Sequence, residues 1–141
     1  WILNLLFYYV LENRKIYLIL EEPESHLYPE AQSRVAEAMG LFLNAGNCML
    51  VTTHSPYILG SINNLMYAGA LSEQYPESVE KIIAKERQMH AEHTAAYYVR
   101  EGTLNNIMDD SEPLIQNSVI DGISMEINDQ MDQLLQIDMG E

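Results

Sequence analysis

The chain is poor in basic residues and in cysteine. Its 141 residues include 7 lysines and arginines against 21 aspartates and glutamates, and the formal net charge is −14. Residues 71–141 hold 15 of these acidic side chains and 4 of the basic ones. A surface of this sign repels phosphate backbones, so we do not expect this segment to grip nucleic acid itself. The single cysteine, Cys48, leaves no disulfide framework and no thiolate metal site, which is typical of a cytoplasmic protein.

A membrane-spanning segment is also missing from the sequence. The apolar run at residues 1–10 is too short to cross a bilayer and is followed at once by charged residues, so we predict a buried helix over residues 1–11. The hydrophobic content of 48% suits a globular protein, and the length suits a single domain over residues 1–141. Because the chain begins at Trp1 inside this run, we expect it to be a piece of a longer protein.

Two short apolar runs carry the strongest pattern in the chain. Residues 16–20 and 48–52 are partly β-branched and predict strands, and the stretch between them has helical spacing from Pro29 onward. Two strands joined through a helix in about 30 residues form a βαβ unit, whose strands lie parallel in one sheet. The near-continuous apolar character of the strands predicts that both faces of the sheet are covered, with Cys48 in the core. The fold class is therefore α/β with parallel core strands.

The rest of the chain is predicted to form shorter elements. The Glu101-Gly102 pair suits the tight turn of a β-hairpin, because glycine accepts positive φ, and the apolar spacing after residue 117 predicts an amphipathic helix. The expected elements are a helix at 56–62, a brief strand near 65–67, a helix at 76–90, hairpin strands at 95–99 and 103–108, and a final helix at 118–137.

Chemically active side chains follow both strands. Glu21 and Glu22 directly end the first strand, and adjacent carboxylates at such a place suit a bound cation or a positively charged ligand. His54 follows the second strand and can donate a hydrogen bond to a phosphate oxygen. Ligands of open parallel sheets bind at the carboxyl ends of the strands, where these residues fall. The pattern predicts half of a nucleotide-hydrolysing site, although a solvated acidic turn and a structural histidine are the simpler alternatives.

These motifs resemble the ABC-type ATPases of the OLD family and related bacterial AAA-annotated proteins of DNA repair and phage defence. Residues 16–24 look like the Walker B segment, residues 25–32 like the D-loop and the start of the next helix, and residues 52–56 like the switch-histidine loop. The hairpin around Gly102 is similar to the one that closes such heads. The order of motifs covers about residues 1–108, with a core at 1–70 and an acidic part at 71–141.

The resemblance implies a role for each matching residue. Glu21 would take the position associated with Mg²⁺, Glu22 would orient the attacking water, and His54 would sense the γ-phosphate of ATP. His26, Leu27 and Tyr28 would lie where the D-loop meets the opposite head of a head-to-head homodimer. Glu21 departs from the aspartate that most ABC-type ATPases have at its position.

A phosphate-binding loop is absent from the sequence. Such a loop needs Gly-x-x-x-x-Gly-Lys-Ser/Thr, and none of the seven glycines is followed by lysine. The chain therefore resembles the carboxyl-terminal part of an ATPase head, a P-loop NTPase without its P-loop, and we expect it to be inactive alone. Any nucleic acid would be bound by other parts of the parent protein.

Two other functions remain open. The acidic second half could dock another subunit, with the carboxylates only shaping the surface. A metal-dependent hydrolase could use His26, His54 and the carboxylates. The spacing of His90 and His93 could hold a metal on a helix, and Asp109, Asp110 and Glu112 suit a solvated loop.

Overall fold

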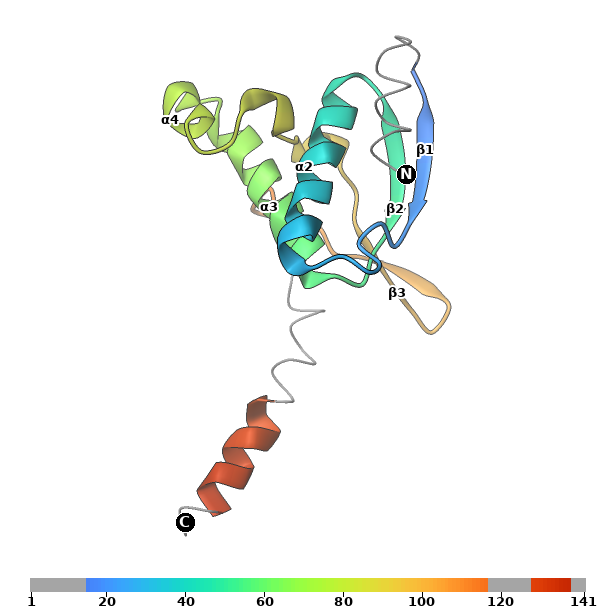
Figure 1. Ribbon diagram of the computed structural model, residues 1–141, viewed down its shortest axis with the longest axis vertical. Coiled ribbons are helices and arrows are strands. Elements are labelled where there is room, and N and C mark those ends of the chain that lie inside the picture. Colours follow the sequence, from blue (N-terminus) through green and yellow to red (C-terminus); the bar gives the residue numbers. More distant parts are fainter. Residues whose placement is uncertain (1–14, 117–127, 138–141) are drawn as a thin grey trace.

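A parallel βαβ unit forms the first part of the structure, a computed structural model that describes residues 15–116 and 128–137 (Figure 1). Strand β1 (Tyr17–Glu21) pairs with β2 (Cys48–Thr52), and helix α2 (Pro29–Asn44) connects them. The register places Glu21 opposite Thr52, so the carboxyl ends of the strands meet at one edge of the sheet. The predicted parallel pairing is confirmed. The helix predicted at 1–11 lies outside the described residues.

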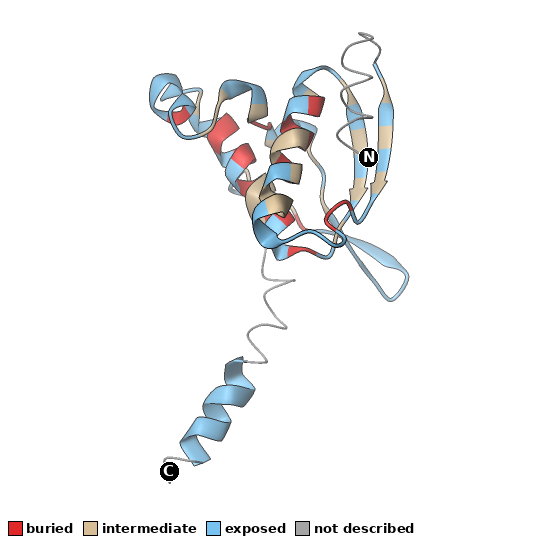
Figure 2. Ribbon diagram, in the orientation of Figure 1, coloured by how far each residue is buried: buried red, intermediate tan, exposed pale blue. Residues whose placement is uncertain are grey.

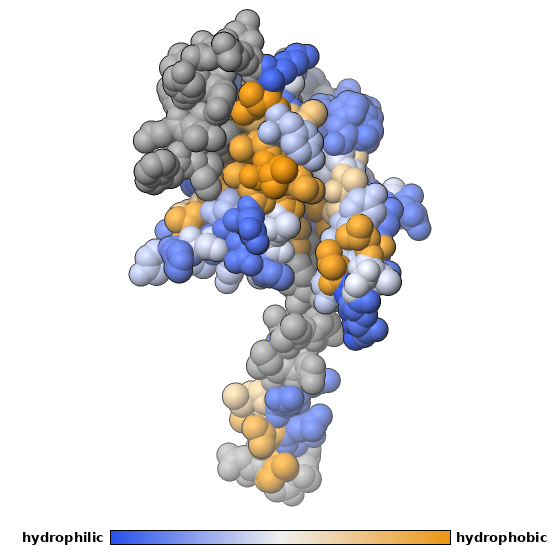
Figure 3. Space-filling view, turned by 90° about the vertical axis from the view of Figure 1, so that its right-hand side faces the viewer, coloured by the Kyte–Doolittle hydropathy of each residue, from blue (hydrophilic) through white to orange (hydrophobic). Residues whose placement is uncertain are grey.

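The sheet is covered less than the sequence predicts. Exposure alternates along both strands, and Tyr17, Ile19 and Leu50 are 65%, 67% and 51% exposed. Cys48 is exposed as well, so the prediction of a core position for it is wrong. Helix α2 lies on one face of the sheet (Figures 1 and 2). The face that carries Tyr17, Ile19 and Leu50 has no cover among the described residues. Figure 3 shows apolar side chains gathered over this part of the molecule.

Helix α3 (Pro56–Leu71) is longer than predicted and replaces the strand expected near 65–67. Leu65 and Met66 continue the buried stripe of Ile58 and Leu59 at helical spacing, so packing favours helix throughout. Asn63 interrupts the apolar pattern, yet its side chain is buried because it donates to the carbonyl oxygen of Ile115 and accepts from the amide nitrogen of the same residue.

The helix predicted at 76–90 is wrong for most of its length. Helix α4 covers only Pro76–Glu80, and two 3₁₀ turns follow, η1 (Lys85–Arg87) and η2 (Ala91–His93). The backbone between them runs so close to α2 and α3 that a Cβ at Gly40 would fall on the carbonyl oxygen of Arg87, and one at Gly69 on that of Met89. A continuous helix would carry this backbone away from the two glycines, so close packing overrides the local pattern.

The hairpin is confirmed, with slightly shorter strands than predicted. Strands β3 (Tyr97–Arg100) and β4 (Thr103–Asn106) pair antiparallel, and Glu101 and Gly102 both have positive φ, 52° and 76°. Positive φ at both central residues matches the twist of the flanking strands. Both strands are exposed, and the hairpin projects from the body (Figure 1).

A buried hydrophobic cluster lies between the helices and the later loops. Its buried side chains come from α2, α3 and the segments around residues 89, 107 and 115: Ala36, Leu59, Leu65, Met66, Met89, Ile107 and Ile115.

The final helix is described over residues 128–137, where every residue is exposed. Met131, Leu134 and Leu135 are 56%, 62% and 49% exposed, so packing of this stripe against the chain's own core is not observed. Figure 1 shows this helix set apart from the α/β body. Residues 118–127 of the predicted helix lie outside the described residues. Among those described, no helix combines the length and the apolar character needed to cross a bilayer.

Candidate active site

The first loop of the site, residues 22–28, follows β1, and we name it the acidic loop. Its backbone turns sharply at Glu22, where φ is 42°, and the Glu22 amide donates to the carbonyl oxygen of Thr52 over 2.9 Å. A non-glycine residue with positive φ is unfavourable by itself and persists only where the surroundings hold it. The loop therefore has a conformation that its contacts with the end of β2 help to impose.

The second loop, residues 53–55, joins β2 to α3, and we name it the histidine loop. Ser55 is the N-cap of α3, and its hydroxyl oxygen accepts from the amides of Tyr57 and Ile58 over 3.1 and 3.2 Å. Pro56 occupies the first helical position, where its missing N–H costs nothing. This cap places His54 directly before the helix.

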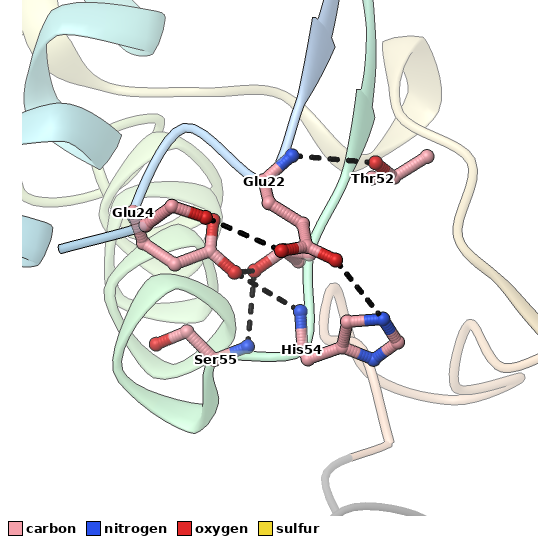
Figure 4. A network of polar contacts seen from close by, with 7 residues as sticks. Glu22, Glu24, Thr52, His54 and Ser55 are labelled. Atoms are coloured by element: carbon pink, nitrogen blue, oxygen red, sulfur yellow. Dashed lines mark hydrogen bonds and ion pairs between the residues drawn. The ribbon is translucent and has the colours of Figure 1, made fainter.

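Glu22 and His54 are brought together, as their places after parallel strands predict. His54 Nε2 lies 3.5 Å from Glu22 Oε1, and the side chains are 87% and 48% exposed (Figure 4). The contact is an ion pair only when the imidazole is protonated, and such an exposed pair adds little to stability. Both groups are therefore open to a ligand at the carboxyl edge of the sheet.

Glu24 belongs to the same acidic run, where the sequence makes it a candidate for the catalytic role only if Glu22 does not have it. The residue is 8% exposed, and its Oε1 accepts from Thr53 Oγ1 over 2.5 Å and from the amide of His54 over 3.0 Å. Its other oxygen, Oε2, is buried without a hydrogen-bond partner among the described residues. In the sequence Glu24 is a third acid after Pro23, and nothing there predicts its burial.

Gln32 connects the same two loops from α2. Its Nε2 donates to the carbonyl oxygen of Leu27 over 2.9 Å, and its Oε1 accepts from Ser55 Oγ over 2.5 Å. The sequence pattern placed Gln32 only at the helix start that follows the D-loop-like turn.

The remaining predicted site residues lie at the rim. Glu21 lies on the exposed face of β1 together with Tyr17 and Ile19. His26 has φ of 67°, and Leu27 and Tyr28 are 38% and 84% exposed. This turn therefore presents side chains to the outside and does not contribute to the Glu22–His54 contact.

The donor set suits a magnesium ion only in part. Carboxylate oxygens are ligands that Mg²⁺ prefers, and Glu21 and Glu22 supply them at adjacent positions. In the described residues no three acidic, histidine or cysteine side chains gather into a metal site. An ion held by these residues would have to take its other ligands from phosphate oxygens and water, the usual arrangement for Mg²⁺ at nucleotide sites.

The other clusters in the sequence have structural explanations. His90 and His93 meet edge to face with ring centroids 6.3 Å apart, at a 3₁₀ turn and not on the predicted helix. Asp109 Oδ1 accepts from the amide and hydroxyl of Ser111 and from the amide of Glu112, and these bonds lower the pKa of Asp109. The hydrolase alternative, which requires a protein-held metal, has no such cluster in the described part of the chain.

Fold and site together define a mixed α/β unit with an acid and a histidine at the carboxyl edge of parallel strands. Residues 2–59 match the family model of the AAA ATPase domain, and this segment contains both loops of the site. The match supports an ATPase-related segment. Comparison with curated proteins and with solved structures finds no match.

Proposed function

We propose that the chain supplies the hydrolytic side of an ATPase head. One observation carries the proposal: parallel pairing of β1 and β2 places the Glu22 carboxylate 3.5 Å from the His54 imidazole, inside the segment that matches the AAA ATPase domain. A carboxylate and a hydrogen-bond donor at one strand edge are the groups that phosphoryl transfer to water needs.

Each residue of the site has a distinct task in this proposal. The Glu22 carboxylate accepts a hydrogen bond from the attacking water and orients it, while His54 donates to an oxygen of the γ-phosphate. Glu21 would hold Mg²⁺, which would neutralise phosphate charge when bound. The chain contains no glycine followed by lysine and therefore no phosphate-binding loop. The other contacts with ATP must then come from a different part of the protein. The chain alone is therefore expected neither to bind ATP tightly nor to hydrolyse it.

The wider context is proposed from the resemblance to OLD-family ATPases. Residues 1–141 act as one unit, the carboxyl-terminal part of a cytoplasmic head. The exposed turn His26–Tyr28 faces a second copy in a head-to-head homodimer. The parent protein acts in DNA repair or phage defence, and parts outside this acidic chain bind the nucleic acid.

Substitution of Glu22 in the complete gene product that contains this chain tests the proposal. Glu22→Gln preserves size but removes the charge that orients water, so we expect ATP binding to persist and steady-state hydrolysis to fall by about a hundredfold or more. Glu80→Gln, at the exposed end of α4, is the matched control and should hydrolyse ATP at the wild-type rate. Turnover of Glu22→Gln within a few-fold of wild type would remove Glu22 from the mechanism.

An acidic interaction module is the second candidate, and the exposed apolar stripe of residues 128–137 favours it. In that case the residues of the site would have no catalytic role, and Glu22→Gln would leave any ATP turnover of the complete protein unchanged.

A further inference from the structure

We infer that Glu24 is a positioning residue. It connects the histidine loop to the acidic loop by hydrogen bonds and so determines the position of the His54 backbone. This inference deepens the proposed function, since it concerns how the same site is assembled. Glu24 contacts the backbone of His54 and not its ring, so its role differs from that of Glu22, whose carboxylate faces the imidazole (Figure 4).

The hydrogen bonds of Glu24 hold two consecutive residues of the histidine loop, an arrangement that we call the Glu24 clamp. One oxygen accepts both from the Thr53 hydroxyl and from the His54 amide, which come from the loop after β2, whereas Glu24 itself follows β1. Hydrogen bonds to a charged acceptor are about twice as strong as neutral ones. The carboxylate thereby fixes the first two residues of the histidine loop at once.

The burial of Glu24 argues against a direct role in binding a ligand. Glu24 is buried, with 8% of the residue exposed, whereas Glu22 is an exposed residue. Burying a carboxylate is costly unless hydrogen bonds compensate it, and the histidine loop supplies such bonds to Oε1, while Oε2 has no partner among the described residues. A solvated turn would gain nothing from a buried acid, so this placement is expected only where the connection itself matters.

Gln32 makes the connection double. Its amide bridges the carbonyl oxygen of Leu27 and the hydroxyl of Ser55, and the Ser55 amide donates to Thr53 Oγ1 over 3.0 Å. A continuous path of hydrogen bonds therefore runs from the Leu27 carbonyl through Gln32, Ser55 and Thr53 to Glu24. Because both loops are held at two points, they form one rigid unit.

Backbone strain in the acidic loop supports the same assignment. Glu22 and His26 have positive φ values of 42° and 67°, and Glu24 lies midway between them. Such conformations persist where surrounding contacts impose them. The contacts of Glu24 and Gln32 with the histidine loop are of this kind.

Two substitutions at Glu24 separate positioning from catalysis. In the complete gene product, Glu24→Gln keeps an oxygen that can accept both bonds, and ATP turnover should stay within about threefold of wild type. Glu24→Leu removes the acceptor, and kcat should fall by about tenfold or more with KM for ATP changed by less than about threefold, because His54 acts on the reacting phosphate. Equal losses in the two variants would make Glu24 catalytic. An unchanged kcat in folded Glu24→Leu would make its role merely structural. Either result overturns the inference.

Hydrogen exchange of the His54 amide, followed by NMR in the 141-residue chain, tests the clamp without ATP. Loss of the acceptor should speed exchange by about tenfold in Glu24→Leu and little in Glu24→Gln, which keeps an acceptor oxygen. If Glu24→Leu does not fold, Thr53→Val, which removes one of the two donors to Glu24, replaces it and should also speed exchange. Unchanged exchange in the folded variant overturns the inference even where ATP is hydrolysed. Absence of ATP turnover in the wild-type protein contradicts the proposed function alone.

Discussion

Two loop regions of the molecule are held by different kinds of contact, one by side-chain hydrogen bonds and the other by close packing of the backbone. At the site, the acidic and histidine loops are connected through the side chains of Glu24, Gln32, Thr53 and Ser55. At the other end of the helices, the backbone of residues 85–89 packs against Gly40 and Gly69, Met89 donates to the carbonyl oxygen of Leu65, and Asn44 donates to two backbone carbonyls. The first connection leaves reactive groups exposed and the second closes the core. Variants in the first should change chemistry, and variants in the second should change stability.

Of the variants that separate these two regions, His54→Ala should have the largest effect. Loss of a donor to the transferring phosphate should lower ATP turnover of the complete gene product by about a hundredfold, in line with donors at other sites of developing charge. The side chain is 87% exposed, so the midpoint of urea unfolding should stay at the wild-type value. His93→Ala, at an exposed histidine of η2, is the control. A clear loss of stability in His54→Ala would contradict the division between the two regions.

Gly69→Ala should destabilise the protein without touching the site. The new methyl group would meet the carbonyl oxygen of Met89, and overpacking of this kind costs about 1–3 kcal/mol. Gly60→Ala on the same helix meets nothing within 4 Å and should stabilise by about 0.5–1 kcal/mol. Urea unfolding of the pair measures the difference. Equal stabilities would mean that residues 85–89 do not approach α3 as closely as described.

Asn63→Ala extends the comparison to the core. There the Asn63 side chain hydrogen-bonds to backbone groups, as Glu24 does at the site. The substitution removes both bonds to Ile115 and leaves buried backbone groups unpaired, so we expect a loss of about 2 kcal/mol. The exposed neighbour Asn64→Ala should change stability by less than about 0.5 kcal/mol. Similar unfolding midpoints for the two variants would show that the Asn63 bonds are not made in solution.

The smallest effect concerns Asp109, in an exposed turn away from both connections. The amide of Ser111, its hydroxyl and the amide of Glu112 lower the pKa of this carboxyl below its ordinary value of 3.8. The charged form therefore favours the folded state, and this contribution is present above about pH 4 and is lost as the pH falls through the folded pKa. Asp109→Asn should lose less stability in acid than the wild type does. A carboxyl pKa of Asp109 at or above 3.8, measured by NMR titration, would show that these three hydrogen bonds do not stabilise the charged form.

The sequence predicts correctly those elements whose conformation depends on residues close together along the chain. The strands around Ile19 and Leu50, helix α2 and the hairpin at Gly102 follow from apolar runs and turn residues, and the parallel pairing follows from the length of the crossover. The meeting of Glu22 and His54 follows from that pairing. The sequence predicts α3 too short and α4 too long, because Asn63 and Gly69 pack against Ile115 and Met89. Both partners lie far along the chain, where a local pattern does not reach. The contacts of Glu24 are not predicted for the same reason, since its partners lie 29 and 30 residues away.

The exposure of Cys48 has a practical consequence. Cys48 is the single thiol of the chain, and it is exposed at the first residue of β2. A fluorophore or spin label attached there would occupy one defined position without any prior removal of other cysteines. Because the sheet face that carries Cys48 is apolar around Ile19 and Leu50, the label would report directly when another surface covers it.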